Sequence, residues 1–210
     1  MSFMLKKCMR SISLMVKALL LAATLAVACG APSTPTGTND ARDPRWAEPL
    51  SRPGLPNLAR IEPDLYRGAQ PVPEGFAALR EMGVKTIVNL RFAHTDRDEI
   101  GEAGLAEGAF ELVEIPMLAS QPELEETRAF LAAAADPARR PLFFHCKHGA
   151  DRTGTMAAAY RVVVQGWPHD DAVAEMTSGG FGFHPVWRGL PPFVMGLDAA
   201  ALRKELGLAP

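Results

Sequence analysis

Hydrophobic and polar positions along the chain follow two periods in turn, which predicts alternating strands and helices. Short runs rich in β-branched and aromatic residues predict buried strands, at residues 85–90, 110–115 and 142–145. Longer amphipathic or wholly apolar segments predict helices, at residues 74–82, 123–135 and 152–165. This order of elements predicts an α/β domain in which helices flank a mainly parallel central sheet.

Less regular segments complete this plan. Residues 61–71 predict a short edge strand and a turn, and the polar residues 96–107 predict a helix. Pro116 is expected to stop the strand before it. The C-terminal part is expected to hold a helix, an irregular stretch and a last helix, at residues 169–176, 181–192 and 194–206. In such sheets ligands bind at the carboxyl ends of the strands, so the chemistry is expected there.

The first 28 residues have the pattern of a signal peptide. Four basic residues, at positions 6, 7, 10 and 17, precede the small-apolar run Ala18–Ala28. The sequence Ala26-Val27-Ala28-Cys29-Gly30 resembles a bacterial lipoprotein cleavage box, although Ala26 stands where Leu is usual. The resemblance implies a lipid on Cys29 and a membrane-anchored protein of the cell envelope, facing the periplasm or the outside. A plain secretory peptide and an uncleaved anchor are the alternatives.

The next segment, residues 29–59, is expected to be a flexible tether. Its many prolines, with Gly, Ser, Thr and Asn between them, do not provide the apolar residues that a packed core needs. The globular domain is therefore expected over residues 60–210. Such a segment would hold the domain away from a membrane surface as an extended spacer.

Charge and cysteine content narrow the function further. The chain carries a net charge of −2, and removing the four basic residues of the signal segment leaves 18 basic against 24 acidic residues, or −6. So acidic a chain is a poor candidate for nucleic-acid binding. The three cysteines are Cys8, Cys29 and Cys146. If Cys29 carries a lipid, Cys146 is the one free thiol of the exported protein, which indicates a chemical role.

Residues 145–154 combine a nucleophile with groups that bind phosphate. They read His-Cys-Lys-His-Gly-Ala-Asp-Arg-Thr-Gly, between a predicted strand and a buried helix. A tight loop in that setting points backbone N–H groups and a helix N-terminus at one spot, which suits a tetrahedral anion. The same positive field favours the thiolate of Cys146, and the fork of Arg152 can grip two phosphate oxygens. Gly149 allows a loop conformation that a side chain would block.

This pattern resembles the signature loop of the cysteine-dependent protein tyrosine and dual-specificity phosphatases. Lys147 together with Asp151 looks more like the branch shared by bacterial tyrosine phosphatases, phosphoinositide phosphatases and atypical dual-specificity enzymes. Leu-Tyr-Arg-x-x-Gln-Pro at residues 65–71 and Asn-Leu-Arg at residues 89–91 are similar to segments of the same families. The resemblance implies a single phosphatase-like α/β domain.

The resemblance also implies the roles of individual residues, without a cofactor or a metal. Cys146 attacks phosphorus and forms a cysteinyl-phosphate that water hydrolyses, while Arg152 holds the phosphoryl group. Thr153 offers its hydroxyl to the sulfur and helps it to leave. His145 sets the loop geometry from behind. The expected substrate- and phosphate-binding residues are Lys147, His148, Gly149, Ala150 and Arg91.

The general acid is the role that the sequence leaves open. Many members of these families carry an aspartate on the loop before the last strand, but here that loop, residues 116–122, has no Asp. Asp151 is the preferred substitute because it lies inside the signature loop, although an ion pair with Arg152 is its alternative role. The other candidates are Asp96 and Asp98, which are also typical of a helix N-cap and first turn, and then Glu123.

Substrate class and competing functions remain as alternatives at this stage. The expected substrate is a protein phosphorylated on tyrosine, or on serine or threonine, and the cations of Lys147 and His148 would also suit an inositol phosphate or phosphoinositide. His184, Trp187 and Arg188 are candidates for covering the site, although tryptophan is more often a core residue. The competing classes are a sulfur-transfer or arsenate-reducing enzyme, a non-catalytic phosphate-binding module, and a metal site at residues 145–148.

Overall fold

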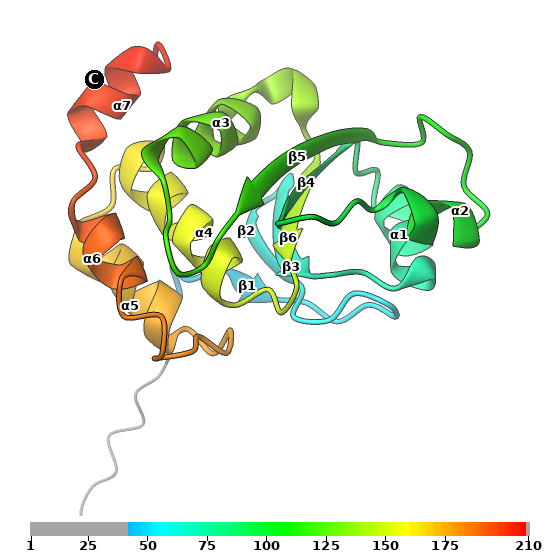
Figure 1. Ribbon diagram of the computed structural model, residues 1–210, viewed down its shortest axis with the longest axis horizontal. Helices are drawn as coiled ribbons and strands as arrows, with labels where there is room; N and C mark the ends of the chain where they lie inside the picture. The colour runs from blue at the N-terminus through cyan, green and yellow to red at the C-terminus, as the bar shows by residue number, and fades with distance from the viewer. Residues whose placement is uncertain (1–41, 209–210) are drawn as a thin grey trace, which may run out of the picture. The chain divides into compact units, whose positions relative to one another are not determined.

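A six-stranded sheet organises the part of the chain that this computed structural model describes, residues 42–208 (Figure 1). Its spatial order is β1-β2-β3-β6-β4-β5. The strands are β1 (Glu48–Pro49), β2 (Ala59–Glu62), β3 (Leu65–Ala69), β4 (Thr86–Arg91), β5 (Glu111–Met117) and β6 (Leu142–Cys146). Strands β3, β6, β4 and β5 run parallel, and β1 and β2 extend the sheet antiparallel from β3. The carboxyl ends of four strands therefore meet at one edge, as the sequence predicts.

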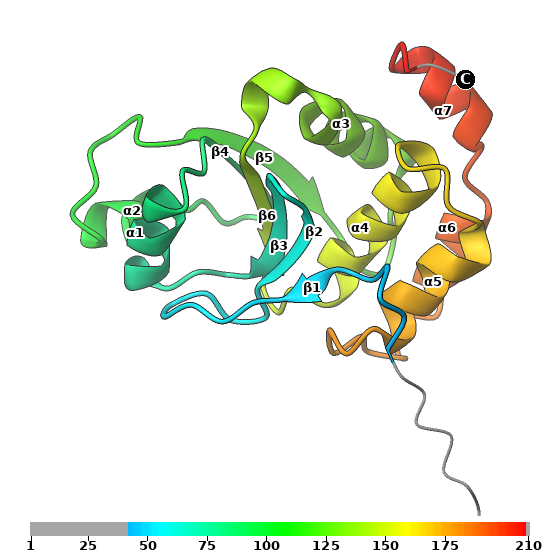
Figure 2. The same ribbon diagram turned by 180° about the vertical axis from the view of Figure 1, so that it is seen from behind.

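Helices cover both faces of this sheet (Figures 1 and 2). Helices α1 (Pro73–Glu81) and α2 (Arg97–Glu102) lie on one face. The helices on the other face are α3 (Leu124–Ala135), α4 (Asp151–Val163), α5 (His169–Ser178), α6 (Leu190–Met195) and α7 (Ala199–Glu205). A single 3-10 turn, Pro137–Arg139, follows α3. The α/β class and the flanking helices are thus confirmed.

Strand β6 and helix α4 form the centre of the fold. All five residues of β6 are buried, with Leu142 and Phe144 facing the α4 side and Phe143 facing the α1 side. Each buried Phe ring stabilises the fold by roughly 1.5–3 kcal/mol. Every residue of α4 except Arg152 is buried, because α4 packs against β3 and β6 below and against α3, α5, α6 and α7 around it. The connection between β6 and α4 is therefore held at both ends by core packing.

Two strand predictions need correction. Strand β3 is an inner strand, paired with β2 on one side and β6 on the other, whereas an edge strand was expected there. Strand β5 continues through Pro116 to Met117 instead of stopping before the proline. The reason is that β5 is the edge of the sheet, where a residue without an N–H costs no ladder hydrogen bond.

Two helix predictions also need correction. The helix expected at residues 96–107 is only α2, and Gly104 just beyond it has φ +71°. The last helix expected at residues 194–206 is two helices, because α6 already begins at Leu190 and ends before Gly196. The carboxylate of Asp198 then accepts a hydrogen bond from the Ala201 N–H and begins α7 as its N-cap.

The beginning of the domain lies earlier than the expected boundary at residue 60. Residues 42–59 were expected to belong to the tether, but Ala47, Leu55 and Leu58 are buried and β1 pairs with β2. The Ala47 N–H also donates to the Glu175 carboxylate at 2.5 Å. The expected signal peptide, Cys29 and the first part of the expected tether lie outside the described residues. Within the described range, no helix has the length and apolar character needed to cross a membrane.

Candidate active site

The signature loop, residues 146–152, joins the end of β6 to the start of α4. Cys146 is the last residue of β6 and is 2% exposed. Gly149 has φ +69°, and a Cβ on it would lie 2.6 Å from the Ala69 nitrogen and from the Gly68 carbonyl carbon of β3. The loop therefore packs directly on the end of β3 at a place where only glycine fits. The sequence-based reason for Gly149 is confirmed, with β3 as the obstacle.

Arg152 reaches over the carboxyl edge of the sheet. Its Nη1 donates to the carbonyl of Leu90 at the end of β4 and to that of Met117 at the end of β5, both at 3.3 Å. Arg152 is half-buried while the rest of α4 is buried. The ends of β4 and β5 thus orient the guanidinium at the same edge of the sheet as Cys146, the last residue of β6. An arginine that binds a phosphoryl group requires such a fixed orientation.

A chain of hydrogen bonds runs from Arg91 to the backbone carbonyl of Cys146. Arg91 Nη1 donates to Gln70 Oε1 at 2.9 Å, and Gln70 Nε2 donates to Asp96 Oδ1 at 2.8 Å. The other oxygen of Asp96 lies 2.9 Å from His145 Nε2, and His145 Nδ1 lies 3.4 Å from the Cys146 carbonyl. His145 is fully buried and stacks on Phe143 at 5.6 Å. The predicted position of His145 behind the loop therefore agrees with the structure.

The surroundings of Asp96 do not suit the role of general acid. Its side chain is 1% exposed, so burial opposes ionisation, but the hydrogen bonds from His145 and Gln70 and the nearby imidazoles lower the pKa of Asp96 below its ordinary value of 3.8. A carboxylate held ionised has no proton to donate at neutral pH. Asp96 does occupy the N-cap position of α2, as the sequence suggested, but its side chain makes no capping hydrogen bond with that helix. Asp96 instead fixes His145.

Asp151 pairs with His184 and not with Arg152. It is the first residue of α4, and its carboxylate accepts a hydrogen bond from the His184 N–H at 2.9 Å. The His184 Nδ1 lies 2.9 Å from the other oxygen. The ring of His148 stands 5.5 Å from that of His184. His184 thus covers this end of the loop, as one alternative from the sequence suggested, whereas Trp187 packs against the core.

The remaining candidate substrate-binding and catalytic residues differ in exposure and in hydrogen-bond partner. Lys147 and His148 point outward and are exposed, and Arg91 borders an open hollow beside Pro116. The buried Thr153 hydroxyl donates to the Gly68 carbonyl at 3.4 Å, whereas the sulfur of Cys146 was its expected partner. Ala150 is buried directly before α4.

The other two candidates for the general acid stand apart from this arrangement. Asp98 is exposed on α2. Glu123 precedes α3, where its N–H donates to the Glu126 carboxylate at 3.0 Å. Glu123 therefore serves the start of that helix.

Two groups of side chains bring three potential metal-ligand atoms within 4.8 Å of one another. One group is His148, Asp151 and His184, and the other is His94, Asp96 and Glu99. In the first group the carboxylate already accepts hydrogen bonds from His184. In the second, Asp96 already binds Gln70 and His145. The metal site considered at residues 145–148 finds no support, because the His145 ring faces Asp96.

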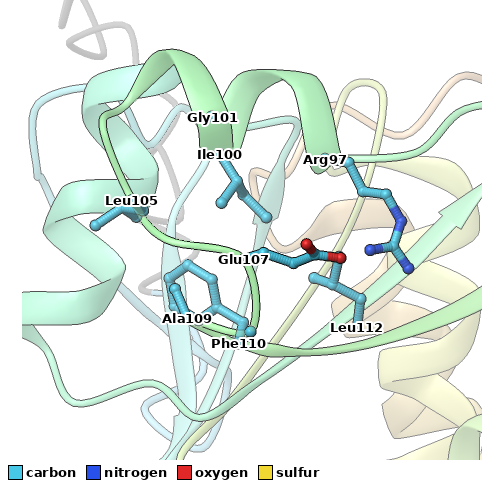
Figure 3. Close-up of a pocket in the computed structure, with 9 residues that line it drawn as sticks. Arg97, Ile100, Gly101, Leu105, Glu107, Ala109, Phe110 and Leu112 are labelled. Carbon is cyan, nitrogen blue, oxygen red and sulfur yellow. The ribbon is translucent and has the colours of Figure 1, made fainter.

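A separate pocket lies between α2 and the segment that leads into β5 (Figure 3). Ile100, Leu105, Phe110 and Leu112 supply apolar walls, and Arg97 and Glu107 extend beside them. None of its lining residues belongs to the signature loop or to the hydrogen-bond chain behind it. The pocket therefore plays no part in the chemistry of Cys146.

Sequence reasoning missed the working partners of this site. Gln70 and Arg67 both belong to the quoted Leu-Tyr-Arg-x-x-Gln-Pro segment, but no role was assigned to either. Gln70 links Arg91 to Asp96. Arg67 is fully buried and its Nη2 donates to the Gly149 carbonyl at 2.8 Å. The available signal was a charged residue within an otherwise apolar strand pattern.

Comparisons with known proteins agree with this geometry. Residues 57–185 match the family model described as DSP-PTPase phosphatase fused to NAD+ kinase. The chain is 38% identical over 187 residues to the dual specificity protein phosphatase TpbA of Pseudomonas aeruginosa strain UCBPP-PA14, covering 88% of this chain and 82% of that protein.

Solved structures give the same result. A crystal structure of P. aeruginosa TpbA, as a cysteine-to-serine variant in complex with phosphotyrosine, matches with a TM-score of 0.67 at 34% identity, covering 80% of this chain and 99% of the other. The catalytic core of the PP-IP phosphatase SIW14 of S. cerevisiae matches with a TM-score of 0.64, covering 76% of this chain and 98% of the other. At 20% identity, this match supports a shared fold and nothing more.

Proposed function

This chain belongs to the dual-specificity (DSP-PTPase) phosphatase family, and we propose that it hydrolyses phosphotyrosine, and phosphoserine or phosphothreonine, in proteins. The observation that carries the proposal is the loop of residues 146–152, which presents a thiol, an arginine fork and a helix N-terminus at one edge of the sheet. The relative of known structure in complex with phosphotyrosine supports the choice of substrate.

The reaction proceeds in two steps. The Cys146 thiolate attacks phosphorus, an S–P bond forms, and the P–O bond to the leaving group breaks while that oxygen takes a proton from the acid. Water then attacks the cysteinyl-phosphate and gives a proton to the carboxylate that the first step left ionised, the S–P bond breaks, and inorganic phosphate leaves while the thiolate and the acid are restored. Arg152 and the loop N–H groups bind the three equatorial oxygens throughout, where the charge of the transition state develops.

Asp151 is the acid that this site supports best. It is the carboxyl group within the signature loop itself, and it is 6% exposed. His184 holds it in place through the backbone and the ring. Asp96 is engaged with His145, and Asp98 and Glu123 serve other segments. A positioned carboxyl group contributes roughly 100- to 10,000-fold to such a step.

A phosphorylated inositol or lipid is the second candidate substrate. The exposed side chains of Lys147 and His148 beside Cys146 support it, since cations at the mouth suit a ligand with more than one phosphate. The inositol diphosphatase DSP4 of Arabidopsis thaliana is 26% identical over 121 residues, 53% of this chain and 57% of that protein. Initial rates on a panel of phosphotyrosine peptides and inositol phosphates decide between the two classes.

Export and anchoring form a further part of the proposal. The apolar run Ala18–Ala28 followed by Cys29 supports a lipoprotein of the bacterial cell envelope, anchored in a membrane through a lipid on Cys29. The test is partition of the full chain and of Cys29→Ala between membrane and soluble fractions. A Cys29→Ala chain that still partitions fully with membranes would refute the lipid anchor.

The test of the enzyme is turnover of an artificial aryl phosphate by the purified full chain. We expect Cys146→Ser to lower kcat at least about 1,000-fold, because the serine hydroxyl is not ionised at neutral pH. Release of the aryl alcohol in a single burst, equal to the enzyme concentration and ahead of phosphate release, would reveal the cysteinyl-phosphate. No turnover by the wild-type chain on any phosphomonoester would refute the proposed function, and full activity in Cys146→Ser would refute the mechanism.

A further inference from the structure

Arg67 is a charged residue in the middle of the core. It lies on β3, its side chain is fully buried, and its guanidinium carbon stands 3.9 Å from the centre of the Phe181 ring. Its Nη2 donates to the Gly149 carbonyl at 2.8 Å. Its Nε and Nη1 are buried and have no hydrogen-bond partner among the described residues. A buried cation with two unpaired nitrogens is costly and requires an explanation.

Glu175, the carboxylate whose charge favours that of Arg67 most, does not pair with it. Glu175 binds Arg161 through both oxygens, at 2.7 and 2.9 Å, and also accepts the Ala47 N–H. Glu175 is therefore fully occupied by other donors. Burial lowers the pKa of Arg67 to about 10, while Glu175 and Cys146 act in the opposite direction and favour its charged form. Cys146 acts on Arg67 in the same direction as Glu175, and it begins the loop that Arg67 binds through the Gly149 carbonyl.

The bond to Gly149 also fixes the direction of a peptide group. In a trans peptide the C=O and the N–H point in opposite directions. When the Gly149 carbonyl points down to Arg67, the N–H of Ala150 therefore points away from Arg67. Arg67 thus fixes the direction of the Ala150 N–H, and the sequence had assigned Ala150 to the phosphate-binding residues.

We propose that Arg67 is a positioning residue of the phosphatase reaction, one that orients the Gly149–Ala150 peptide and stabilises the thiolate of Cys146 by its charge. The inference rests on the proposed function, because it gives Arg67 a part in the same chemistry. The arginine acts through the loop and through Cys146, and Phe181 holds it against that loop from the other side.

Other charged groups around this centre must be kept constant in the test. They come from the segments packed on it and are Arg42, Asp96, His145, Asp151, Arg152, Arg161 and Glu175. Arg42 is the matched control, because it also lies over the Phe181 ring, at 5.4 Å, but binds the carbonyls of Gly179 and Ala47 instead of the loop. Arg42→Gln removes a charge from the same aromatic stack without touching Gly149.

The experiment measures alkylation of Cys146 by iodoacetamide as a function of pH, in the full chain, with Cys8 and Cys29 replaced by alanine in every protein compared. Arg67→Gln keeps a donor for Gly149 and loses the charge, and Arg67→Lys keeps the charge. Losing the opposite charge of Arg67 disfavours the thiolate, so we expect Arg67→Gln to slow alkylation at pH 6 about tenfold and to move its pH midpoint up by about one unit. Arg67→Lys and Arg42→Gln stay within about 0.3 units of the unsubstituted protein.

Turnover of an aryl phosphate is the second readout. We expect kcat of Arg67→Gln to fall with little change in KM at low pH, and Arg67→Lys to restore most of it. Equal folding of all variants is checked by denaturant unfolding, and the smaller buried amide of Gln keeps that variant foldable. An unchanged alkylation midpoint in folded Arg67→Gln overturns the inference, and so does an Arg67→Lys shift as large as that of Gln. Absence of turnover in the wild type, with the midpoint shift present, counts against the proposed function alone.

Discussion

Replacing Asp96 by Asn tests the hydrogen-bond chain behind the nucleophile with a change of one atom. The aspartate accepts from His145 Nε2 at 2.9 Å and from Gln70 Nε2 at 2.8 Å, so both neighbours present donors to it. An asparagine amide has one acceptor and one donor end. Either one contact becomes donor against donor, or the His145 ring changes to the tautomer in which Nε2 accepts from the amide and Nδ1 donates to the Cys146 carbonyl. Rotating the Gln70 amide only moves the mismatch outward, because Gln70 Oε1 accepts from Arg91.

The expected cost follows from these bonds. Two charge-assisted hydrogen bonds, each contributing about 1.5–3 kcal/mol, become at best two neutral bonds of about 1 kcal/mol each. Rotation of Gln70 recovers part of the loss, since the broken contact then lies at the half-buried Arg91. We expect Asp96→Asn to lower the free energy of unfolding by about 2–3 kcal/mol. For a domain of this size that is a fall in Tm of roughly 5–10 °C.

The same change predicts a dependence on pH. The pKa of Asp96 is lower in the folded protein than its ordinary value of 3.8. Its stabilising effect is therefore fully present above about pH 4 and is lost as pH falls through the lower, folded-state pKa. The difference in unfolding free energy between wild type and Asp96→Asn should be constant from pH 7 to 5 and should narrow below about pH 4.

The assay is urea unfolding of both proteins across this pH range, with Asp98→Asn as the control. Asp98 is exposed on the same segment, and its substitution is expected to change the unfolding free energy by less than about 0.5 kcal/mol. Asp96→Asn should also lower kcat at least tenfold, because a more weakly held His145 fixes the backbone of Cys146 less firmly. Equal stability of Asp96→Asn and wild type at pH 7 would refute the reasoning, as would a difference that grows as pH falls.

Three further predictions concern the loop and its supports. Gly149→Ala should lower kcat at least 100-fold, because the added Cβ would lie 2.6 Å from the backbone of Gly68. Normal turnover in that variant would contradict the packing of the loop on β3. Asp151→Asn should lower kcat about 100-fold on phenyl phosphate but only slightly on an aryl phosphate with a strongly acidic leaving group; equal losses on both would exclude Asp151 as the acid. Arg140→Met should lower the free energy of unfolding, measured in urea, by about 3 kcal/mol, because it leaves the Ala134 carbonyl and the Tyr160 hydroxyl without their donor. The same change should leave the pH midpoint of Cys146 alkylation where it is. A shift of that midpoint would show a coupling between Arg140 and Cys146 that the contacts do not contain.

The site could be found from the sequence because its reacting groups are close along the chain. Cys146 and Arg152 are separated by one loop, and strand and helix periodicity on either side places that loop at a sheet edge. Gly149 carried its own signal, since its position within a tight anion-binding loop demands φ above zero. Local rules of backbone geometry were sufficient for each of these residues.

Asp96 shows what local rules leave out, because it occupies the N-cap position of α2 while its side chain binds His145 instead of the helix. A carboxylate before a short polar helix is typical of an N-cap, and nothing nearby in the sequence indicates otherwise. The strand order places β4 beside β6, so the segment after β4 reaches His145, 49 positions further along the chain. Periodicity shows that a side chain is buried but not which distant group it meets. The partner of the Asp96 side chain is therefore set by the topology of the sheet.

The sequence by itself determined the α/β class and the signature loop, and it led to the proposal of Cys146 as nucleophile and Arg152 as phosphate-binding residue, because these depend on neighbours within a few residues. Only the tertiary structure decided that β3 lies inside the sheet, that residues 42–59 pack on the domain, and that Arg67 lies beneath the loop. The physical reason is the same for all three. Pairing β3 with β6 brings together residues about 80 positions apart, and long-range contacts of this kind are selected by the packing of the whole sheet.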